Sequence, residues 1–80
     1  MFDKKTTLQS LSGFGDLNTP IGDIIHSSLE TAELLTILLQ NFSEEEKNKI
    51  LNAIFLELDL GAVTINELID KTDEYYRNPV

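Results

Sequence analysis

Apolar residues recur at helical spacing along two long stretches of the chain, which are joined by a very short bend. Residues 20–41 carry an apolar side chain every three or four positions, and residues 44–60 repeat the pattern. Only Phe42 and Ser43 separate the two stretches. A connection this short predicts that the second helix folds back antiparallel on the first, forming a helical hairpin.

The limits of the hairpin helices are marked by residues that start and stop helices. Thr19 can cap the first helix, and Pro20 fits its first helical position. Ser43 and Glu46 form an S-x-x-E capping box at the start of the second helix. Gly61 predicts a left-handed glycine stop at its end.

A third helix is predicted after the glycine. Thr64 and Glu67 repeat the capping-box pattern at its start. Its apolar face consists of Ile65, Leu68, Ile69, Thr72, Tyr75 and Tyr76. No alternating run flanked by turn residues indicates a strand. The predicted fold class is therefore all-α, an antiparallel helical hairpin plus a third C-terminal helix.

The N-terminal segment lacks a sustained helical pattern. Gly13 and Gly15 interrupt it, so we expect residues 1–18 to form an irregular N-terminal arm and residues 19–80 a single helical domain. Phe14, between the glycines, is either a tether laid over the bundle or an exposed hook for a partner. We favour the tether, because so small a chain needs every apolar group for its core.

The hairpin helices carry more apolar surface than one mutual contact uses. The main face of the first helix comprises Ile21, Ile24, Ile25, Ala32, Leu35, Leu39 and Phe42, and that of the second comprises Ile50, Leu51, Ile54, Phe55 and Leu58. Leu34 and Ile37 lie outside the first face, and Leu56 and Leu60 outside the second. We expect this apolar stripe, with Phe14, to contact another chain, and we predict a homodimer packed through the hairpin.

Negative charge is the dominant compositional feature. Fourteen acidic and six basic residues give a net charge of −8, and no Lys or Arg occurs in residues 6–46. The predicted partner-binding acidic face comprises Asp23, Glu30, Glu33, Glu44 and Glu45. Such a field repels nucleic acid and anionic lipid and attracts basic protein surfaces. Solubility alone is the plainer explanation of the same charge.

The sequence offers little material for catalysis or for binding a metal or cofactor. The absence of cysteine excludes disulfides and thiol chemistry. Asp23, His26, Glu30 and Glu33 have helical spacing compatible with a metal, but the other helices contribute no second histidine. His26 has no nucleophilic partner of a known type, and no glycine pattern resembles a phosphate loop. We therefore predict no catalytic, cofactor-binding or metal residue, and no enzyme.

These observations favour a cytoplasmic protein that acts by binding. No apolar run is long enough to span a bilayer, and the N-terminus lacks a secretory signal. The predicted function is a small acidic interaction module, an adaptor or inhibitor that binds a basic surface of a larger protein. One form of it would be an inhibitor that mimics nucleic acid. The alternatives are a small dimeric helix-turn-helix-like transcriptional regulator and a structural subunit of an assembly.

Overall fold

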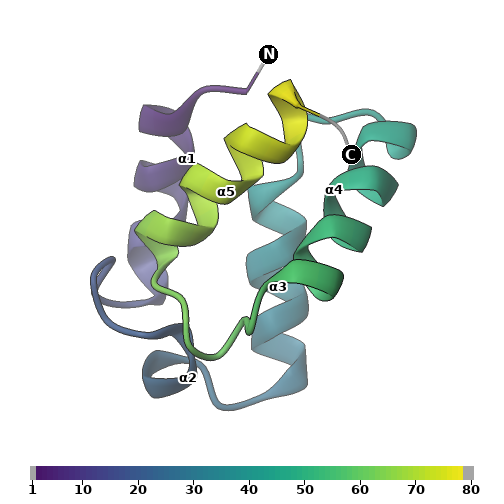
Figure 1. Ribbon diagram of the computed structural model, residues 1–80. Helices are drawn as coiled ribbons and strands as arrows, with labels where there is room; N and C mark the ends of the chain where they lie inside the picture. The colour runs from purple at the N-terminus through teal and green to yellow at the C-terminus, as the bar shows by residue number, and fades with distance from the viewer. Residues whose placement is uncertain (1, 79–80) are drawn as a thin grey trace.

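A computed structural model describes residues 2–78 as a bundle of short helices (Figure 1). In this range the only β-type pairing is an isolated bridge between Pro20 and Thr64. The all-α class predicted from the sequence is thus confirmed. The elements, in chain order, are α1 (Lys4–Leu11), the 3₁₀ turn η1 (Ser12–Phe14), α2 (Ile21–Ile24), α3 (Ser28–Leu38), α4 (Glu44–Glu57) and α5 (Ile65–Arg77).

The N-terminal arm is helical, so the prediction of an irregular segment is wrong there. The Asp3 carboxylate caps α1, accepting hydrogen bonds from the Lys5 backbone N–H at 3.0 Å and the Thr6 hydroxyl at 2.8 Å. These bonds, with that of Thr6 the largest cause, lower the pKa of Asp3. Thr7 and Leu11 turn into the protein and are buried. Because only these two residues of α1 point inward, the spacing of apolar residues in the sequence did not indicate this helix.

An ion pair ties α1 to the C-terminal helix. The Lys4 amine lies 3.0 Å from the Asp70 carboxylate and 3.7 Å from that of Asp73, both on α5. The hydrogen bond to Asp70 is the main reason that the pKa of Lys4 is raised. Helix α1 packs against α5 and α3 (Figure 1). The arm is therefore part of the same folded body as the rest of the bundle.

The first predicted hairpin helix is broken in two. Helix α2 ends before Ile25, which is extended (φ −123°, ψ 122°). Helix α3 restarts at Ser27, whose hydroxyl accepts a hydrogen bond from the Glu30 N–H at 3.1 Å. The N-cap of α2 is Pro20, without a side-chain cap, so the prediction of a Thr19 cap with Pro20 inside the helix is also wrong. Because Ser27 supplies a new cap, the chain can leave the helix and begin another.

The break resets which residues of α3 point inward. On one continuous helix Ala32 would share the buried face with Ile25, and Leu34 would lie outside it. In the structure Leu34 and Leu38 are buried, whereas Ala32 is exposed. In this segment, therefore, a residue predicted to lie outside the buried face is buried, and a residue predicted to lie on that face is exposed.

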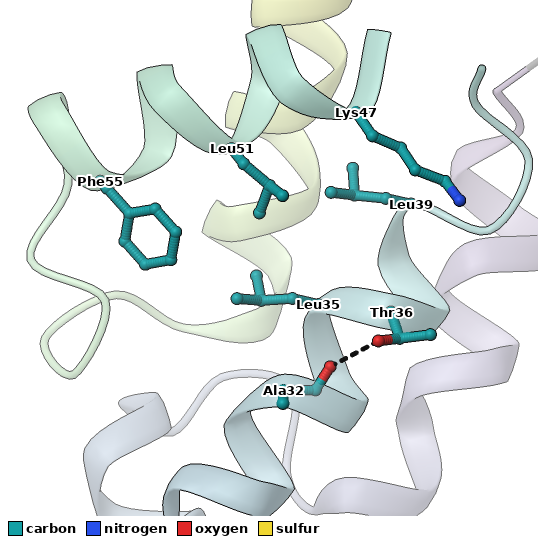
Figure 2. Close-up of a pocket in the computed structure, with 7 residues that line it drawn as sticks. All are labelled: Ala32, Leu35, Thr36, Leu39, Lys47, Leu51 and Phe55. Carbon is teal, nitrogen blue, oxygen red and sulfur yellow. Dashed lines mark hydrogen bonds between the residues drawn. The ribbon is translucent and has the colours of Figure 1, made fainter. Parts of the chain in front are cut away.

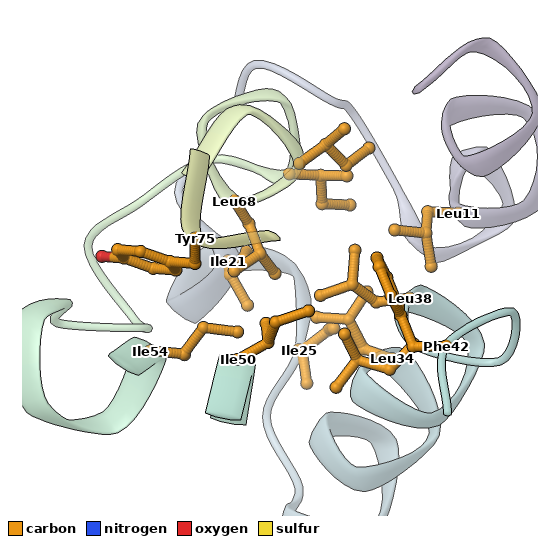
Figure 3. Close-up of a cluster of buried hydrophobic side chains, with 13 residues drawn as sticks. Leu11, Ile21, Ile25, Leu34, Leu38, Phe42, Ile50, Ile54, Leu68 and Tyr75 are labelled. Carbon is orange, nitrogen blue, oxygen red and sulfur yellow. The ribbon is translucent and has the colours of Figure 1, made fainter. Parts of the chain in front are cut away.

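Helices α1, α2, α3, α4 and α5 all contribute side chains to the core (Figure 3). Its buried side chains are Leu11, Ile21, Ile25, Leu34, Leu38, Leu39, Phe42, Ile50, Ile54, Ile65, Leu68, Ile69 and Tyr75. Among the described residues the closely packed helix pairs are α1 with α5, α4 with α5, and α1 with α3. Helices α3 and α4 are not among them, and α4 is inclined to α3 in Figure 1. The predicted hairpin is therefore open, because α4 packs its Ile50 and Ile54 side against α5 instead.

Two capping boxes are confirmed, but the role predicted for Gly61 is wrong. Ser43 with Glu46 and Thr64 with Glu67 make both reciprocal bonds. Within residues 2–78 positive φ occurs only at Gly15 (149°). Gly61 instead allows the loop before α5 to meet α2, since its carbonyl accepts a hydrogen bond from the Gly22 N–H at 2.9 Å. Beside it the Ile21 N–H donates to the Val63 carbonyl at 2.8 Å.

Candidate functional site

The open side of the bundle, between α3 and α4, forms an apolar groove of about 310 Å³. Figure 2 shows its two walls, with the side chains of both helices directed toward the space between them. We call it the α3–α4 groove. It is lined by Ala32, Leu35, Thr36 and Leu39 from α3 and its C-terminal end, and by Lys47, Leu51 and Phe55 from α4.

The floor of the groove is apolar and partly exposed. Leu39 is buried, Leu35 and Leu51 are half-buried, and Phe55 is 64% exposed. Phe55 is left open because α4 turns its Ile54 side toward α5. A large aromatic residue exposed beside a hollow is a feature of protein-binding surfaces.

Polar atoms in the groove are few and already engaged. The Thr36 hydroxyl donates a hydrogen bond to the Ala32 carbonyl at 2.8 Å (Figure 2). The Lys47 amine lies 3.4 Å from the Glu44 carboxylate, and the Lys47 side chain extends past Leu39. Its aliphatic stem adds to the apolar lining while its charge stays at the rim. The groove is thus suited to apolar contacts rather than to bond-making chemistry.

The apolar surface continues onto the outer side of α3. A second hollow of about 420 Å³ is lined by Leu29, Ala32, Glu33, Thr36 and Ile37. It shares Ala32 and Thr36 with the α3–α4 groove. Leu29 is 71% exposed, so this face adds a second open apolar side chain to Phe55.

The predicted acidic residues are all exposed, but they fall into two groups. Asp23 on α2 and Glu30 in the first turn of α3 lie near the start of α3, and Glu33 lies at the middle of α3. Glu44 and Glu45 lie in the first turn of α4, near the other end of α3. Glu30 also accepts a hydrogen bond from the Ser27 hydroxyl at 3.1 Å. Negative charge therefore occurs toward both ends of α3 rather than along one helix face.

The five residues of the predicted apolar stripe occupy different environments. Leu34 is fully buried in the core, so in this conformation it is not available to a partner. Phe14, Ile37 and Leu60 are half-buried and pack against the core. Leu56 is 85% exposed but does not line the groove. Ile37 lines the hollow on the outer side of α3.

Sequence reasoning missed Leu29 and Phe55 as surface residues. Leu29 was not assigned to any face, and Phe55 was assigned to the hairpin contact. The Ser27–Glu30 spacing was a detectable signal of the break, because it repeats the S-x-x-E pattern found before α4 and matched by the T-x-x-E of α5. If a new helix is assumed to begin after Ser27, its buried face need not continue that of the residues before it, and Leu34 can then lie on the inward side.

The possible metal cluster of the sequence is divided by the break in the helix. Asp23 belongs to α2, His26 to the connection, and Glu30 and Glu33 to α3, so they do not share one helical stripe. In the part of the chain that the structure covers, no three His or acidic side chains are placed to hold a metal ion. None of the helices seen there has the length and apolar character needed to cross a membrane.

Thr72 and Tyr75 of α5 place polar groups in the core, and the Thr72 hydroxyl donates a hydrogen bond to the Leu68 carbonyl at 2.7 Å. The Tyr75 hydroxyl is buried without a hydrogen-bond partner. Burial, with Glu57 nearby as the next cause, raises the pKa of Tyr75 to about 12. Tyr75 is on α5 and projects toward α4 beside Ile54 (Figure 3), and it does not line the α3–α4 groove.

Comparison with protein-family models, with curated proteins and with solved structures found no match to this chain. The groove and the charges around it are therefore interpreted from their own chemistry.

Proposed function

We propose that this chain is a small acidic protein-interaction module that binds a basic surface of a larger protein and performs no catalysis. The observation that carries the proposal is the α3–α4 groove, an open apolar hollow with Phe55 exposed at its edge. It lies in a chain of net charge −8. An apolar contact surface surrounded by negative charge suits a partner protein whose surface is positively charged.

Phe55 is the natural anchor of such a contact. A buried aromatic side chain removes about 150–250 Å² from water. At about 25 cal/mol per Å², covering the exposed 64% of Phe55 contributes roughly 3 kcal/mol to association. Leu51 and Leu35 beside it add to this because both are only half-buried. A contact centred on these residues gains enough to be specific.

The carboxylates toward the two ends of α3 supply attraction at longer range. Glu33 and Glu44 lie near opposite ends of the groove, and no Lys or Arg occurs in residues 6–46; the Lys47 amine, 3.4 Å from Glu44, offsets part of the charge at that end. Charge of this kind increases the rate of encounter with a basic surface and loses effect as salt rises. In a narrower form of the proposal, the partner is a nucleic-acid-binding protein whose phosphate sites accept these carboxylates.

The two helices of the predicted hairpin form the two sides of the proposed binding site. Helices α3 and α4 are joined by a short connection, residues 39–43, but stay apart along their lengths. We infer that the partner takes the place between them that direct packing would otherwise fill. The third helix, α5, holds α4 in the open position.

The test is affinity capture from the native cell extract with three forms of the full chain. Phe55→Ser removes the anchor, and Leu56→Ser is the matched control, since Leu56 is its neighbour and is 85% exposed outside the groove. We expect mass spectrometry to identify a protein with a basic surface that the wild type and Leu56→Ser retain and Phe55→Ser loses. Identical sets of proteins on all three forms would refute the proposal.

A homodimer remains a separate proposal with narrower support. Leu29, Phe55 and Leu56 are exposed, but Leu34 is hidden within a single copy. Two copies of charge −8 also repel each other, which favours a basic partner over a second copy. Sedimentation equilibrium of the wild type and Leu56→Glu tests it. This proposal requires a wild-type dimer that Leu56→Glu disperses, and a monomer mass for the wild type at tens of micromolar would end the idea.

A further inference from the structure

The bundle is open on the side between α3 and α4, which are not among the closely packed helix pairs. Helix α3 packs on α1, α1 on α5, and α5 on α4, whereas α4 and α3 do not close on each other. The α3–α4 groove is this open side, and Figure 2 shows Leu35, Leu51 and Phe55 directed into it. An occupant of the groove therefore lies against two helices and covers the edge of the core.

The walls of the groove determine what backbone conformation its occupant has. Both walls are α-helices, whose backbone groups are hydrogen-bonded within each helix. The Thr36 hydroxyl also donates its proton to Ala32 of the same helix. An extended segment would bury its backbone here without partners, and each unpaired group is costly. An α-helix satisfies its own backbone and fits.

The length of the groove sets the spacing of the side chains that fill it. Its α4 wall runs from Lys47 to Phe55, which is eight helical steps or about 12 Å at 1.5 Å per step. Its α3 wall runs from Ala32 to Leu39, about 10 Å. A ridge of three apolar residues at positions i, i+4 and i+7 of a helix spans about 10 Å. Two turns of an amphipathic helix therefore match the groove.

The charges at the rim set the residues that flank this ridge. Glu33 lines the hollow that continues the groove past Ala32. Glu44 lies beside Lys47 at the other end, with the two charged groups 3.4 Å apart. A basic residue about one turn beyond each end of the ridge would meet a carboxylate. At the Glu44 end it would compete with Lys47 for that carboxylate.

We propose that the segment bound in the α3–α4 groove is an amphipathic α-helix with apolar residues at i, i+4 and i+7 and a Lys or Arg about one turn beyond each end. This inference rests on the proposed function and specifies the partner's binding element. A second copy of this chain fits less well, because the residues near its own exposed Leu29 and Phe55 include Glu30, Glu33 and Glu57.

The experiment uses three synthetic peptides of about 18 residues, long enough for the ridge and its flanks. The first has leucines at i, i+4 and i+7 on an Ala-rich helix with Lys at both ends. The second has the same composition with the leucines spread around the helix. The third replaces the flanking lysines by Glu. Binding to the full chain is measured by fluorescence anisotropy, and the site is mapped by amide chemical shifts.

We expect the first peptide to bind with shifts confined to α3 and α4, and the other two to bind at least about tenfold more weakly. Phe55→Ser should weaken the first peptide by about tenfold or more, whereas Asn52→Ser, at an exposed position of α4 outside the groove, should leave it unchanged. Lys47→Met should strengthen it, because Glu44 is then free for the peptide's lysine. Each of these results supports the inference.

The two proposals fail in different ways. Equal binding of the first and second peptides would show recognition of charge alone, which overturns the helical inference and leaves the basic-partner proposal standing. Equal binding of the first and third would overturn the role of the carboxylates in both. No binding of any peptide at millimolar concentration would overturn the helical inference, while the capture experiment decides the proposed function independently. Blockage of the groove by a dimer of this chain would also overturn the inference.

Discussion

Replacing Gly22 by alanine should destabilise the fold, because two backbones meet at this glycine. A Cβ atom on Gly22 would lie 2.9 Å from the Gly61 carbonyl oxygen and 3.4 Å from the Gly61 Cα. Both are backbone atoms, so no side chain can rotate out of the way. The start of α2 and the loop before α5 would have to separate. Hydrogen bonds from Ile21 to Val63 and from Gly22 to Gly61 join them there.

The size of the effect follows from these contacts. Each backbone hydrogen bond contributes about 0.5–1.5 kcal/mol, and crowding of this kind typically costs about 1–3 kcal/mol. Alanine recovers at most about 1 kcal/mol through its better helix propensity, since Gly22 lies in α2. The net loss in the free energy of unfolding should be about 2–3 kcal/mol. For a domain of this size that lowers Tm by roughly 10–20 °C.

The assay is urea and thermal unfolding followed by circular dichroism, with Gly13→Ala as the control. A Cβ on Gly13 would have no neighbour within 4 Å, and its φ is not positive. That variant should be as stable as the wild type or more stable by up to about 1 kcal/mol. If Gly22→Ala unfolds at the same urea concentration as Gly13→Ala, the close contact between Gly22 and Gly61 does not stabilise the fold.

Three further predictions test other parts of the structure. Ser27→Ala removes the cap of α3 and should lower stability by about 1 kcal/mol in urea unfolding, and Ser27→Asp should restore it. Leu34→Ala should cost about 2–5 kcal/mol because Leu34 is fully buried, whereas Leu56→Ala should change stability by less than about 0.5 kcal/mol, measured the same way. Burial raises the pKa of Tyr75 to about 12, so between pH 10 and 12 the unfolded chain ionises this phenol before the folded chain does, and stability falls as pH rises. Tyr75→Phe should remove that fall and be no less stable at pH 7, since the buried hydroxyl has no partner; an unchanged pH profile would contradict this.

The helix starts that could be predicted from the sequence are those whose signal is local. Ser43 with Glu46 and Thr64 with Glu67 each satisfy backbone donors within four residues, whatever packs around them. Their position is therefore set before any tertiary contact forms. The third helix was predicted well for the same reason, and its buried face matches the expected one except at Tyr76, which is 37% exposed.

The break between α2 and α3 was not predicted, because continuous apolar spacing in residues 20–41 concealed it. Ile25 is buried both in the predicted helix and in the observed extended conformation, so its hydrophobicity does not distinguish the two. The break is determined by Ser27, which caps α3, and by the hydrogen bonds that hold Ile21 and Gly22 to the loop before α5. Those bonds join residues about 40 positions apart. No local pattern reports such a contact.

The groove was not predictable for a different reason. The C-terminal half of helix α4 carries apolar residues on several faces, and these faces compete for the core. Helix α5 packs against the side that carries Ile50 and Ile54, and this leaves Leu51 and Phe55 at the surface. Which side is covered depends on where α5 and α1 dock. The candidate site is thus a product of tertiary packing, and only its negative charge was readable from the sequence.

The open state of the groove has a structural cause, which bears on how it would bind. Closing α3 onto α4 would bury Phe55, but it would draw α4 away from α5 or α3 away from α1, where Leu34 and Ile54 are fully enclosed. The gain from covering the exposed part of Phe55, roughly 3 kcal/mol, is matched by the loss of packing around either Leu34 or Ile54, about 2–5 kcal/mol. The groove is therefore held open by the core itself. A partner would meet a preformed surface, so little of its binding free energy is spent on rearranging the bundle.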